Sequence, residues 1–248
     1  MPPVPRPQKN NCPDPARVEA LFERFRLANP APSTELEYAS PFQLLIAVIL
    51  SAQTTDRAVN LITRSLFSRA PDAASVLALG EKQLTVALNT IGLYKTKSRH
   101  IMATCKKLIE HHDGAVPDNR EQLEALPGVG RKTANVMLNT AFGAATLAVD
   151  THIFRLAHRI GLSQGKTPLV VEQDLLKLIP ERYLKDAHHW LILHGRYICN
   201  ARKPACWRCS INDICSYQDK SEPPGGQVPV DLSLLHGTKK NPPAARRE

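Results

Sequence analysis

Four cysteines near the C-terminus constrain the fold of this chain more than any other feature of its sequence. They lie in the segment CNARKPACWRCSINDIC with the spacing C-x6-C-x2-C-x5-C, at Cys199, Cys206, Cys209 and Cys215. In an intracellular protein, so dense a group is typical of a metal site rather than of a disulfide framework. Four thiolates suit either structural zinc or an iron–sulfur cluster, and the spacing alone does not decide between them. The remaining alternative is four reduced cysteines without a metal.

Elsewhere the apolar residues recur with the period of an α-helix. Aromatic residues make up only 5% of the chain, which argues against a β-rich fold. The stretch PFQLLIAVILSAQ is apolar on almost every face and predicts a central, buried helix. We therefore predict an all-α protein of many short helices. The expected buried faces are Val18, Leu21, Phe22 and Phe25; Ala58, Leu61, Ile62 and Ser65, with Leu66 alongside; Ile101, Cys105 and Leu108; and Ile153, Leu156, Ala157 and Ile160.

The charge and the two ends of the chain indicate a basic, globular body with loose termini. Residues 1–15 hold six prolines and residues 222–248 are of mixed low complexity, so we expect neither end to pack firmly. The net charge is +9, and most of it falls on residues 16–221. A basic body favours a polyanionic partner such as nucleic acid. The longest apolar run, Leu44 to Leu50, is too short for a membrane span, and the N-terminus has no apolar leader. These features predict a cytoplasmic protein.

The segment LPGVG predicts a helix–hairpin–helix, with NREQLEAL before it and RKTANVMLNTAF after it. The glycines allow unusual backbone conformations and leave amide groups uncovered at the start of the following helix. Such a site fits a DNA phosphate without reading any base. The residues concerned are Gly128, Val129, Gly130 and Arg131. A plain turn with a helix cap is the alternative.

Lys132 lies in the first turn of that second helix, where the helix dipole and Arg131 both disfavour a positive charge. A lysine that is readily neutral is suited to Schiff-base chemistry, because only the free amine attacks a carbon. It shares a helix face with Asn135 and Asn139; if Lys132 is a catalytic lysine, this polar face would look into a cleft. The alternative is an ordinary solvent-facing lysine. Asp150, in AVDTHIFRL, is predicted to be the N-cap of another helix, without a capping box.

Taken together, these motifs resemble the endonuclease III family of DNA glycosylases. The resemblance runs from about residue 16 to about residue 217 and includes SAQTTD at 51–56, IGLYKTKSRHI at 91–101 and VDTHIFRLAHRIG. It implies a [4Fe-4S] cluster on the four cysteines, with Lys132 as catalytic nucleophile and Asp150 as catalytic carboxylate. The implied activity is base-excision repair. The enzyme would flip an oxidised pyrimidine such as thymine glycol out of duplex DNA, remove it, and cleave the abasic site by β-elimination.

The resemblance also implies roles in DNA binding. Gln53 and Leu93 would fill the space that the flipped base vacates, and His152 would lie close to the lesion. Arg202 and Lys203, between the first two cysteines, would face the phosphate backbone. Simple alternatives are a core position for Leu93, surface polar positions for Gln53 and His152, and ordinary solvated charges for the basic pair.

The implied architecture has two helical lobes. Residues 34–145 would form a six-helix domain with the hairpin, and residues 16–33 plus 146–221 would form the cluster domain. DNA would bind across the groove between them, and the protein would act as a monomer associated with the nucleoid. Two rival functions are a non-catalytic iron–sulfur protein that binds DNA, and a glycosylase of the same scaffold that acts on a thymine–guanine mispair or a pyrimidine dimer.

Overall fold

The computed structural model describes residues 13–226, and every regular element within that range is a helix. The predicted all-α fold is therefore confirmed. The prediction of flexible ends concerns mainly residues 1–12 and 227–248, which lie outside the described residues. No helix of the described chain combines the length and the apolar character needed to cross a bilayer. The helices are α1 (Pro15–Ala28), α2 (Pro41–Ser51), α3 (Asp56–Arg69), α4 (Ala73–Ala87), α5 (Tyr94–His112), α6 (Arg120–Glu124), α7 (Arg131–Thr140), α8 (Thr151–Ile160), α9 (Pro168–Leu178) and α10 (Glu181–Tyr197), with short 3-10 turns at Cys206–Arg208 and Pro224–Gly226.

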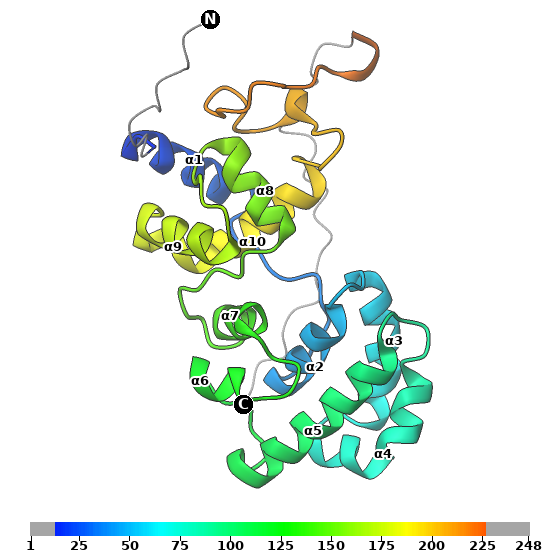
Figure 1. Ribbon diagram of the computed structural model, residues 1–248. Coiled ribbons are helices and arrows are strands. Elements are labelled where there is room, and N and C mark those ends of the chain that lie inside the picture. The colour runs from blue at the N-terminus through cyan, green and yellow to red at the C-terminus, as the bar shows by residue number, and fades with distance from the viewer. Residues whose placement is uncertain (1–12, 227–248) are drawn as a thin grey trace, which may run out of the picture.

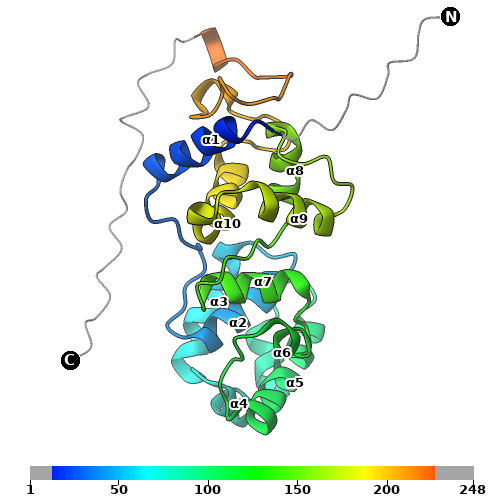
Figure 2. The same ribbon diagram turned by 90° about the vertical axis from the view of Figure 1, so that its left-hand side faces the viewer.

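The helices form two lobes (Figure 1). We call α2–α7 the hairpin lobe, and α1 with α8, α9, α10 and the cysteine segment the cysteine lobe. Figure 2 shows α1 lying against α8–α10, although more than 100 residues of chain separate them. Each lobe has its own hydrophobic core: one is built from residues between Leu36 and Leu138, the other from residues 18–25 and 147–211. The chain crosses between the lobes twice, after α1 and after α7.

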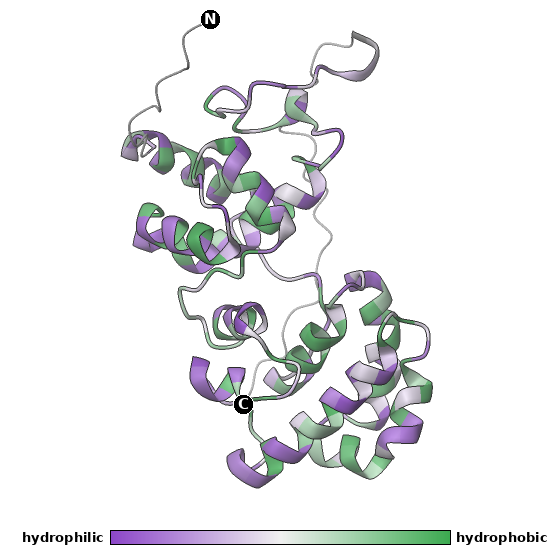
Figure 3. Cartoon of the chain, in the orientation of Figure 1, coloured by the Kyte–Doolittle hydropathy of each residue, from purple (hydrophilic) through white to green (hydrophobic). Residues whose placement is uncertain are grey.

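Helix α2 is the centre of the hairpin lobe, as the sequence predicted. Its apolar residues from Leu44 to Leu50 are all buried, and its ribbon is hydrophobic over most of its length in Figure 3. Ser40 begins the helix by accepting a hydrogen bond from the backbone N–H of Gln43, and Pro41 occupies the first helical position. Burial of an apolar side chain contributes about 1.5–3 kcal/mol, so this helix dominates the stability of its lobe.

The predicted buried face of α3 was correct in part. Leu66 is buried, and Ala58 and Ile62 are partly buried against the core. Leu61 is 62% exposed and Ser65 also faces solvent, whereas Val59 and Thr63, which were not predicted, are buried. Apolar residues occupy two adjacent faces of this helix, and a shift of one residue rotates a helix by about 100°. Packing against α2 and α4 selects the face, so the periodicity of α3 alone could not identify it.

Candidate active site and nucleic-acid interface

The hairpin joins α6 to α7 and packs on α5. The backbone N–H of Val129 donates to the carbonyl of Leu126 at 3.0 Å, and the Thr104 hydroxyl donates to the carbonyl of Pro127 at 2.7 Å. In the part of the chain that the structure describes, no side chain caps the first turn of α7, so its backbone N–H groups are left available at the positive end of the helix dipole. The arrangement can bind an anion through the backbone.

The two glycines of the hairpin have different reasons to be glycine. Gly128 has φ +81°, and a Cβ there would come within 3.0 Å of the His100 side chain. Gly130 is extended, with φ −100° and ψ −178°, and a Cβ there would meet nothing within 4 Å. The expectation that both need unusual backbone angles is therefore correct for Gly128 and wrong for Gly130. An open Gly130 leaves room for a ligand to approach the amides.

Alanine at these two positions should separate the two reasons. Gly128→Ala should lower the free energy of unfolding by about 1–3 kcal/mol, because it adds left-handed strain and a contact with His100. Gly130→Ala should change that free energy by less than about 0.5 kcal/mol. Urea unfolding of both variants measures the difference. Equal losses in the two variants would contradict the assignment of strain to Gly128.

Lys132 and Asp150 line one cavity of about 390 Å³ between the lobes. Lys132 is exposed in the first turn of α7, on the hairpin lobe. Asp150 is the N-cap of α8, on the cysteine lobe, and its Oδ1 accepts hydrogen bonds from the N–H groups of His152 and Ile153, both at 2.9 Å. Within residues 13–226 no donor reaches Oδ2, so one carboxylate oxygen caps the helix and the other is free for chemistry.

The polar face next to Lys132 does not look into a cleft. Asn135 and Asn139 are buried, and the Asn135 amide donates to the carbonyl of Leu147 at 2.8 Å. The Asn139 amide donates to the carbonyl of Lys185 on α10 at 2.9 Å, and also to the carbonyls of Ala144 and Thr146. These two side chains tie α7 to the crossing segment and to the other lobe. Of the predicted polar face, only Lys132 reaches the cavity.

Gln53 and Leu93 both stand in left-handed backbone conformations. Their φ angles are +55° and +60°, which cost non-glycine residues about 1–3 kcal/mol and concentrate at functional sites. Leu93 is 56% exposed, which excludes the alternative of a core residue. Gln53 is exposed and lines the cavity that holds Lys132. Two exposed side chains are thus held in strained turns, one before α3 and one before α5.

Lys97 supports the Gln53 turn, and sequence reasoning missed it. Its ammonium group is buried and donates to the carbonyl of Leu50 and to the hydroxyl of Thr54, both at 2.9 Å. Burial lowers its pKa. The available signal was a lysine in the motif IGLYKTKSRHI at the spacing of the buried face of α5. A cation that joins the end of α2 to the next turn explains how the strain at Gln53 is sustained.

His152 and Arg131 occupy different surroundings from those expected. His152 follows Asp150 in the wall of the cavity, so it is not merely a surface residue. The Arg131 guanidinium forms a two-pronged ion pair with Glu172 of α9, at 2.7 and 3.0 Å, and Glu172 is buried. Arg131 therefore joins the lobes in this structure, and its DNA contact stays a prediction.

His188 and His189 also line the cavity, and sequence reasoning did not single them out. They come from α10, in the segment HHW. His188 is buried beside the cavity, and its Nδ1 atom has no hydrogen-bond partner among the described residues. Burial lowers the pKa of His188 to about 3, and the nearby charges of His189 and Lys132 act in the same direction. The imidazole is therefore neutral at neutral pH.

The low pKa of His188 predicts a pH-dependent stability. Between its ordinary value of 6.5 and about 3, the unfolded chain binds a proton at this residue and the folded chain does not. Protonation of His188 therefore favours the unfolded chain. The free energy of unfolding is unaffected by this residue above about pH 6.5 and decreases as the pH falls from about 6.5 to about 3. The urea midpoint of His188→Gln should decline less than that of the parent protein between about pH 7 and pH 4. His111→Gln, an exposed control, should follow the parent; equal slopes in all three proteins would contradict the prediction.

The four cysteines line one cavity with apolar walls that include Leu156, Ile160 and Ile211. Burial raises the pKa of the Cys209 thiol to about 12 and also raises that of Cys215. The Arg159 guanidinium approaches the Cys199 sulfur at 3.4 Å and donates to the carbonyls of Asn200 and Ala201. Within residues 13–226 no three potential ligands converge closely enough to hold a single metal ion.

The loop between the first two cysteines exposes its basic residues. Arg202 and Lys203 are both exposed, while the neighbouring Pro204 is buried. Arg155 supports the loop from α8, because its guanidinium donates to the carbonyls of Gly195 and Cys199 at 2.7 and 3.0 Å. Sequence reasoning missed Arg155 and Arg159, although their spacing of four places both on one face of a predicted helix.

Comparison with known proteins agrees with the fold and the motifs. Residues 46–181 match the family described as HhH-GPD superfamily base excision DNA repair protein. Endonuclease III of Haemophilus influenzae is 56% identical over 206 residues, covering 83% of this chain and 97% of that protein. Endonuclease III of Escherichia coli K12 is 54% identical and covers 82% and 96%. A solved structure of a trapped endonuclease III–DNA covalent intermediate has a TM-score of 0.77 and 39% identity, covering 82% of this chain and 96% of that chain.

The helical fold, the hairpin and these matches define a base-excision DNA repair protein of the helix–hairpin–helix class. The relatives make the assignment narrower: the chain belongs to the endonuclease III family, whose members are DNA glycosylases with AP lyase activity. The resemblance found in the sequence is thereby confirmed, as is the enzyme class.

Proposed function

We propose that this enzyme removes oxidised pyrimidines of the thymine glycol type from duplex DNA, acting as a monomer, and cleaves the resulting site through a Schiff base on Lys132. The observation that carries the proposal is the shared cavity between the lobes, where a lysine from one lobe and a carboxylate from the other meet. The structural relative trapped as a covalent intermediate with DNA supports a covalent mechanism. A cavity of about 390 Å³ is large enough for a single flipped base.

The chemistry requires both groups. The neutral Lys132 amine attacks the anomeric carbon of the sugar, and the base leaves with the electrons of the glycosidic bond and a proton. The sugar ring then opens to an iminium on Nζ. Loss of a proton from the neighbouring carbon expels the 3′ phosphate by β-elimination, and water releases the enzyme. Asp150 stabilises the positive charge that builds on the sugar and assists proton transfer at Lys132.

DNA reaches this cavity only if the target nucleotide leaves the stack, which costs a few kcal/mol. The exposed and strained Gln53 and Leu93 are suited to fill the vacated space, and His152 faces the lesion from the cavity wall. The uncapped amides at Gly128, Val129 and Gly130 are suited to hold a phosphate. Arg202 and Lys203 add exposed positive charge, and Arg131 contributes to the interface if its ion pair with Glu172 exchanges for a phosphate.

The cysteine cavity fits a [4Fe-4S] cluster held by Cys199, Cys206, Cys209 and Cys215. Buried thiols with raised pKa values become thiolates only with a strong counter-charge, which a metal group provides. All four cysteines line this one cavity, and the family resemblance favours an iron–sulfur cluster over zinc there. When bound, the cluster supplies folding energy to the loop that carries Arg202 and Lys203. Iron and sulfide analysis of protein purified without oxygen tests this assignment; zinc in their place would contradict it.

Borohydride trapping tests the catalytic proposal. The enzyme is incubated with a duplex carrying one thymine glycol, and matched duplexes carry a thymine–guanine mispair, a pyrimidine dimer or an abasic site. We expect covalent adducts on thymine glycol and on the abasic site. An adduct on the abasic site alone would retain the lyase and exclude thymine glycol as the substrate. No adduct on any duplex despite tight DNA binding would contradict the Schiff base.

A further inference from the structure

The proposed catalytic pair is divided between two lobes, so its geometry depends on what holds the lobes together. All of the extensively packed helix pairs lie within one lobe or the other. Between the lobes, polar side chains provide the contacts: Asn139 with Lys185, Arg131 with Glu172, and Arg196 with residues of the hairpin lobe. A few directional bonds therefore set the alignment of Lys132 with Asp150.

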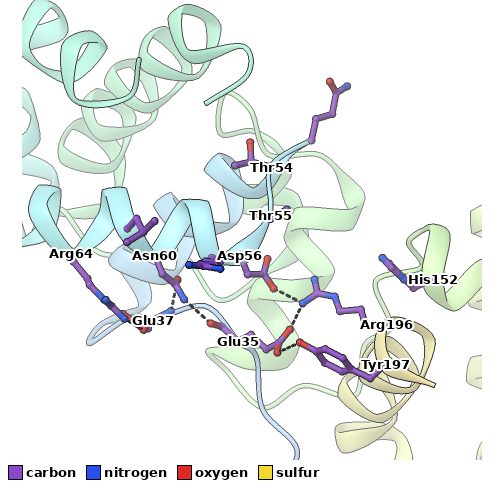
Figure 4. A pocket seen from close by; sticks show the side chains of 13 residues that line it. Glu35, Glu37, Thr54, Thr55, Asp56, Asn60, Arg64, His152, Arg196 and Tyr197 are labelled. Atoms are coloured by element: carbon purple, nitrogen blue, oxygen red, sulfur yellow. Dashed lines mark hydrogen bonds and ion pairs between the residues drawn. The ribbon is translucent and has the colours of Figure 1, made fainter. Parts of the chain in front are cut away.

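Of these residues, Arg196 contacts two carboxylates that belong to different segments of the chain. It lies in the last turn of α10, and its Nη1 donates to Glu35 Oε2 at 2.6 Å and also to Asp56 Oδ2. Glu35 accepts a second hydrogen bond from the hydroxyl of Tyr197. Figure 4 shows the Arg196 side chain reaching across to the Asp56 and Glu35 carboxylates. One guanidinium thus joins α10 to the start of α3 and to the chain between α1 and α2.

Burial makes this contact energetically distinct from a surface ion pair. The Arg196 side chain is 26% exposed and that of Asp56 is 14% exposed. Nearby, Arg64 of α3 pairs with Glu37, just before α2, at 2.5 Å, but these side chains are 63% and 47% exposed and the pair does not reach the cysteine lobe. Removal of one partner from a buried pair leaves a desolvated charge, whereas exposed pairs contribute little.

The elements that Arg196 joins are those that carry the site. Asp56 is the first residue of α3 and follows the strained Gln53 turn directly. On the other side, the residue before Arg196 is Gly195, where a Cβ would come within 3.0 Å of the Cβ of His152. Arg196 and Asp56 also line the cavity that contains Lys132 and Asp150. A shift at this ion pair therefore moves the Gln53 turn relative to the start of α8.

We propose that Arg196 is a positioning residue of the active site: by bridging Asp56 and Glu35, it aligns the lobe that carries Lys132 with the lobe that carries Asp150. The inference rests on the proposed function, because it takes these two residues as the reacting pair. Arg196 acts through Asp56 and not by touching the substrate. A displacement of about 1 Å between reacting groups costs about a hundredfold in rate. Loss of the Arg196 contact should therefore slow the chemical step.

The test measures single-turnover strand cleavage at saturating enzyme, on the duplex that traps with the parent protein. Arg196→Gln and Asp56→Asn should each slow the reaction by about tenfold to a hundredfold, and the double variant should be no slower than the worse single one. Arg196→Lys should keep part of the rate, because it retains the positive charge but replaces the planar guanidinium with a shorter side chain that ends in an ammonium group. Glu37→Gln, which breaks the exposed pair within one lobe, should stay within about twofold of the parent. Thermal unfolding of each variant confirms that it is folded.

The competing explanation is that Arg196 binds a DNA phosphate. In that case Asp56→Asn would release the guanidinium and tighten DNA binding without slowing cleavage, and the salt dependence of binding in Arg196→Gln would weaken by about one phosphate contact. Either result overturns the proposal, as does a double variant whose losses multiply. Failure of the proposed function is separate: there the parent protein itself would give no adduct.

Discussion

Replacement of Lys132 by glutamine should abolish the borohydride-trapped adduct and reduce base release by a factor on the order of 10⁴ to 10⁶, the usual cost of removing a covalent nucleophile. Glutamine is one atom shorter than lysine and can still donate hydrogen bonds, but it has no amine that can form an iminium. Because Lys132 is exposed at the start of α7, the fold should not depend on it.

Two measurements accompany this variant. DNA binding by Lys132→Gln should remain within about tenfold of the parent, because the variant loses only one positive charge near the DNA phosphates and its hairpin is intact. Lys106→Gln removes an exposed lysine from α5 that pairs only with Glu110, and it should trap as efficiently as the parent. A trapped adduct that persists in Lys132→Gln would show that another amine is the nucleophile.

Asp150→Asn should slow the chemical step by about 10²- to 10⁴-fold while the stability of the protein changes little. Asparagine is as good an N-cap as aspartate, so its oxygen can still accept from the N–H groups of His152 and Ile153. What disappears is the negative charge that stabilises the developing cation and takes part in proton transfer. Single-turnover kinetics and urea unfolding of the same preparation measure the two effects separately.

Asp150→Ala provides the comparison. It removes the charge and the cap together, so it should show a similar loss of rate and also a loss of about 0.5–2 kcal/mol in stability. If Asp150→Asn cleaves at the parent rate, the carboxylate is a structural cap only. If both variants lose stability equally, the assignment of helix capping to Oδ1 and of the chemistry to Oδ2 is wrong.

Several elements followed directly from local sequence. Periodicity predicted the buried faces of α1 and α8, because each helix has a single continuous apolar stripe. Helix α2 was predicted to be buried because it is apolar on almost every face. Asp150 was predicted as an N-cap because a short acidic side chain just before an amphipathic segment can accept hydrogen bonds from the first backbone N–H groups of the helix. The hairpin was predicted from LPGVG, because proline and glycine mark a turn between two helical segments.

The errors share a cause. Leu61 and Ser65 of α3 were expected to be buried but face solvent, and Asn135 and Asn139 were placed toward a cleft when they are buried against carbonyls of the crossing segment and α10. In both cases the local pattern offered two faces, and only the partner helix selects one. A polar side chain is buried when its hydrogen bonds are satisfied, and those acceptors come from residues that periodicity does not reveal.

The sequence by itself therefore determined the helices, the hairpin, the spacing of the four cysteines and the family, since each depends on residues close together in the chain or on motifs read as strings. Tertiary structure alone decided that Lys132 and Asp150 share a cavity, that Lys97 supports the Gln53 turn, and that Arg131 and Arg196 join the lobes. These contacts link side chains from distant parts of the chain, and their existence depends on how two separate hydrophobic cores are set against each other.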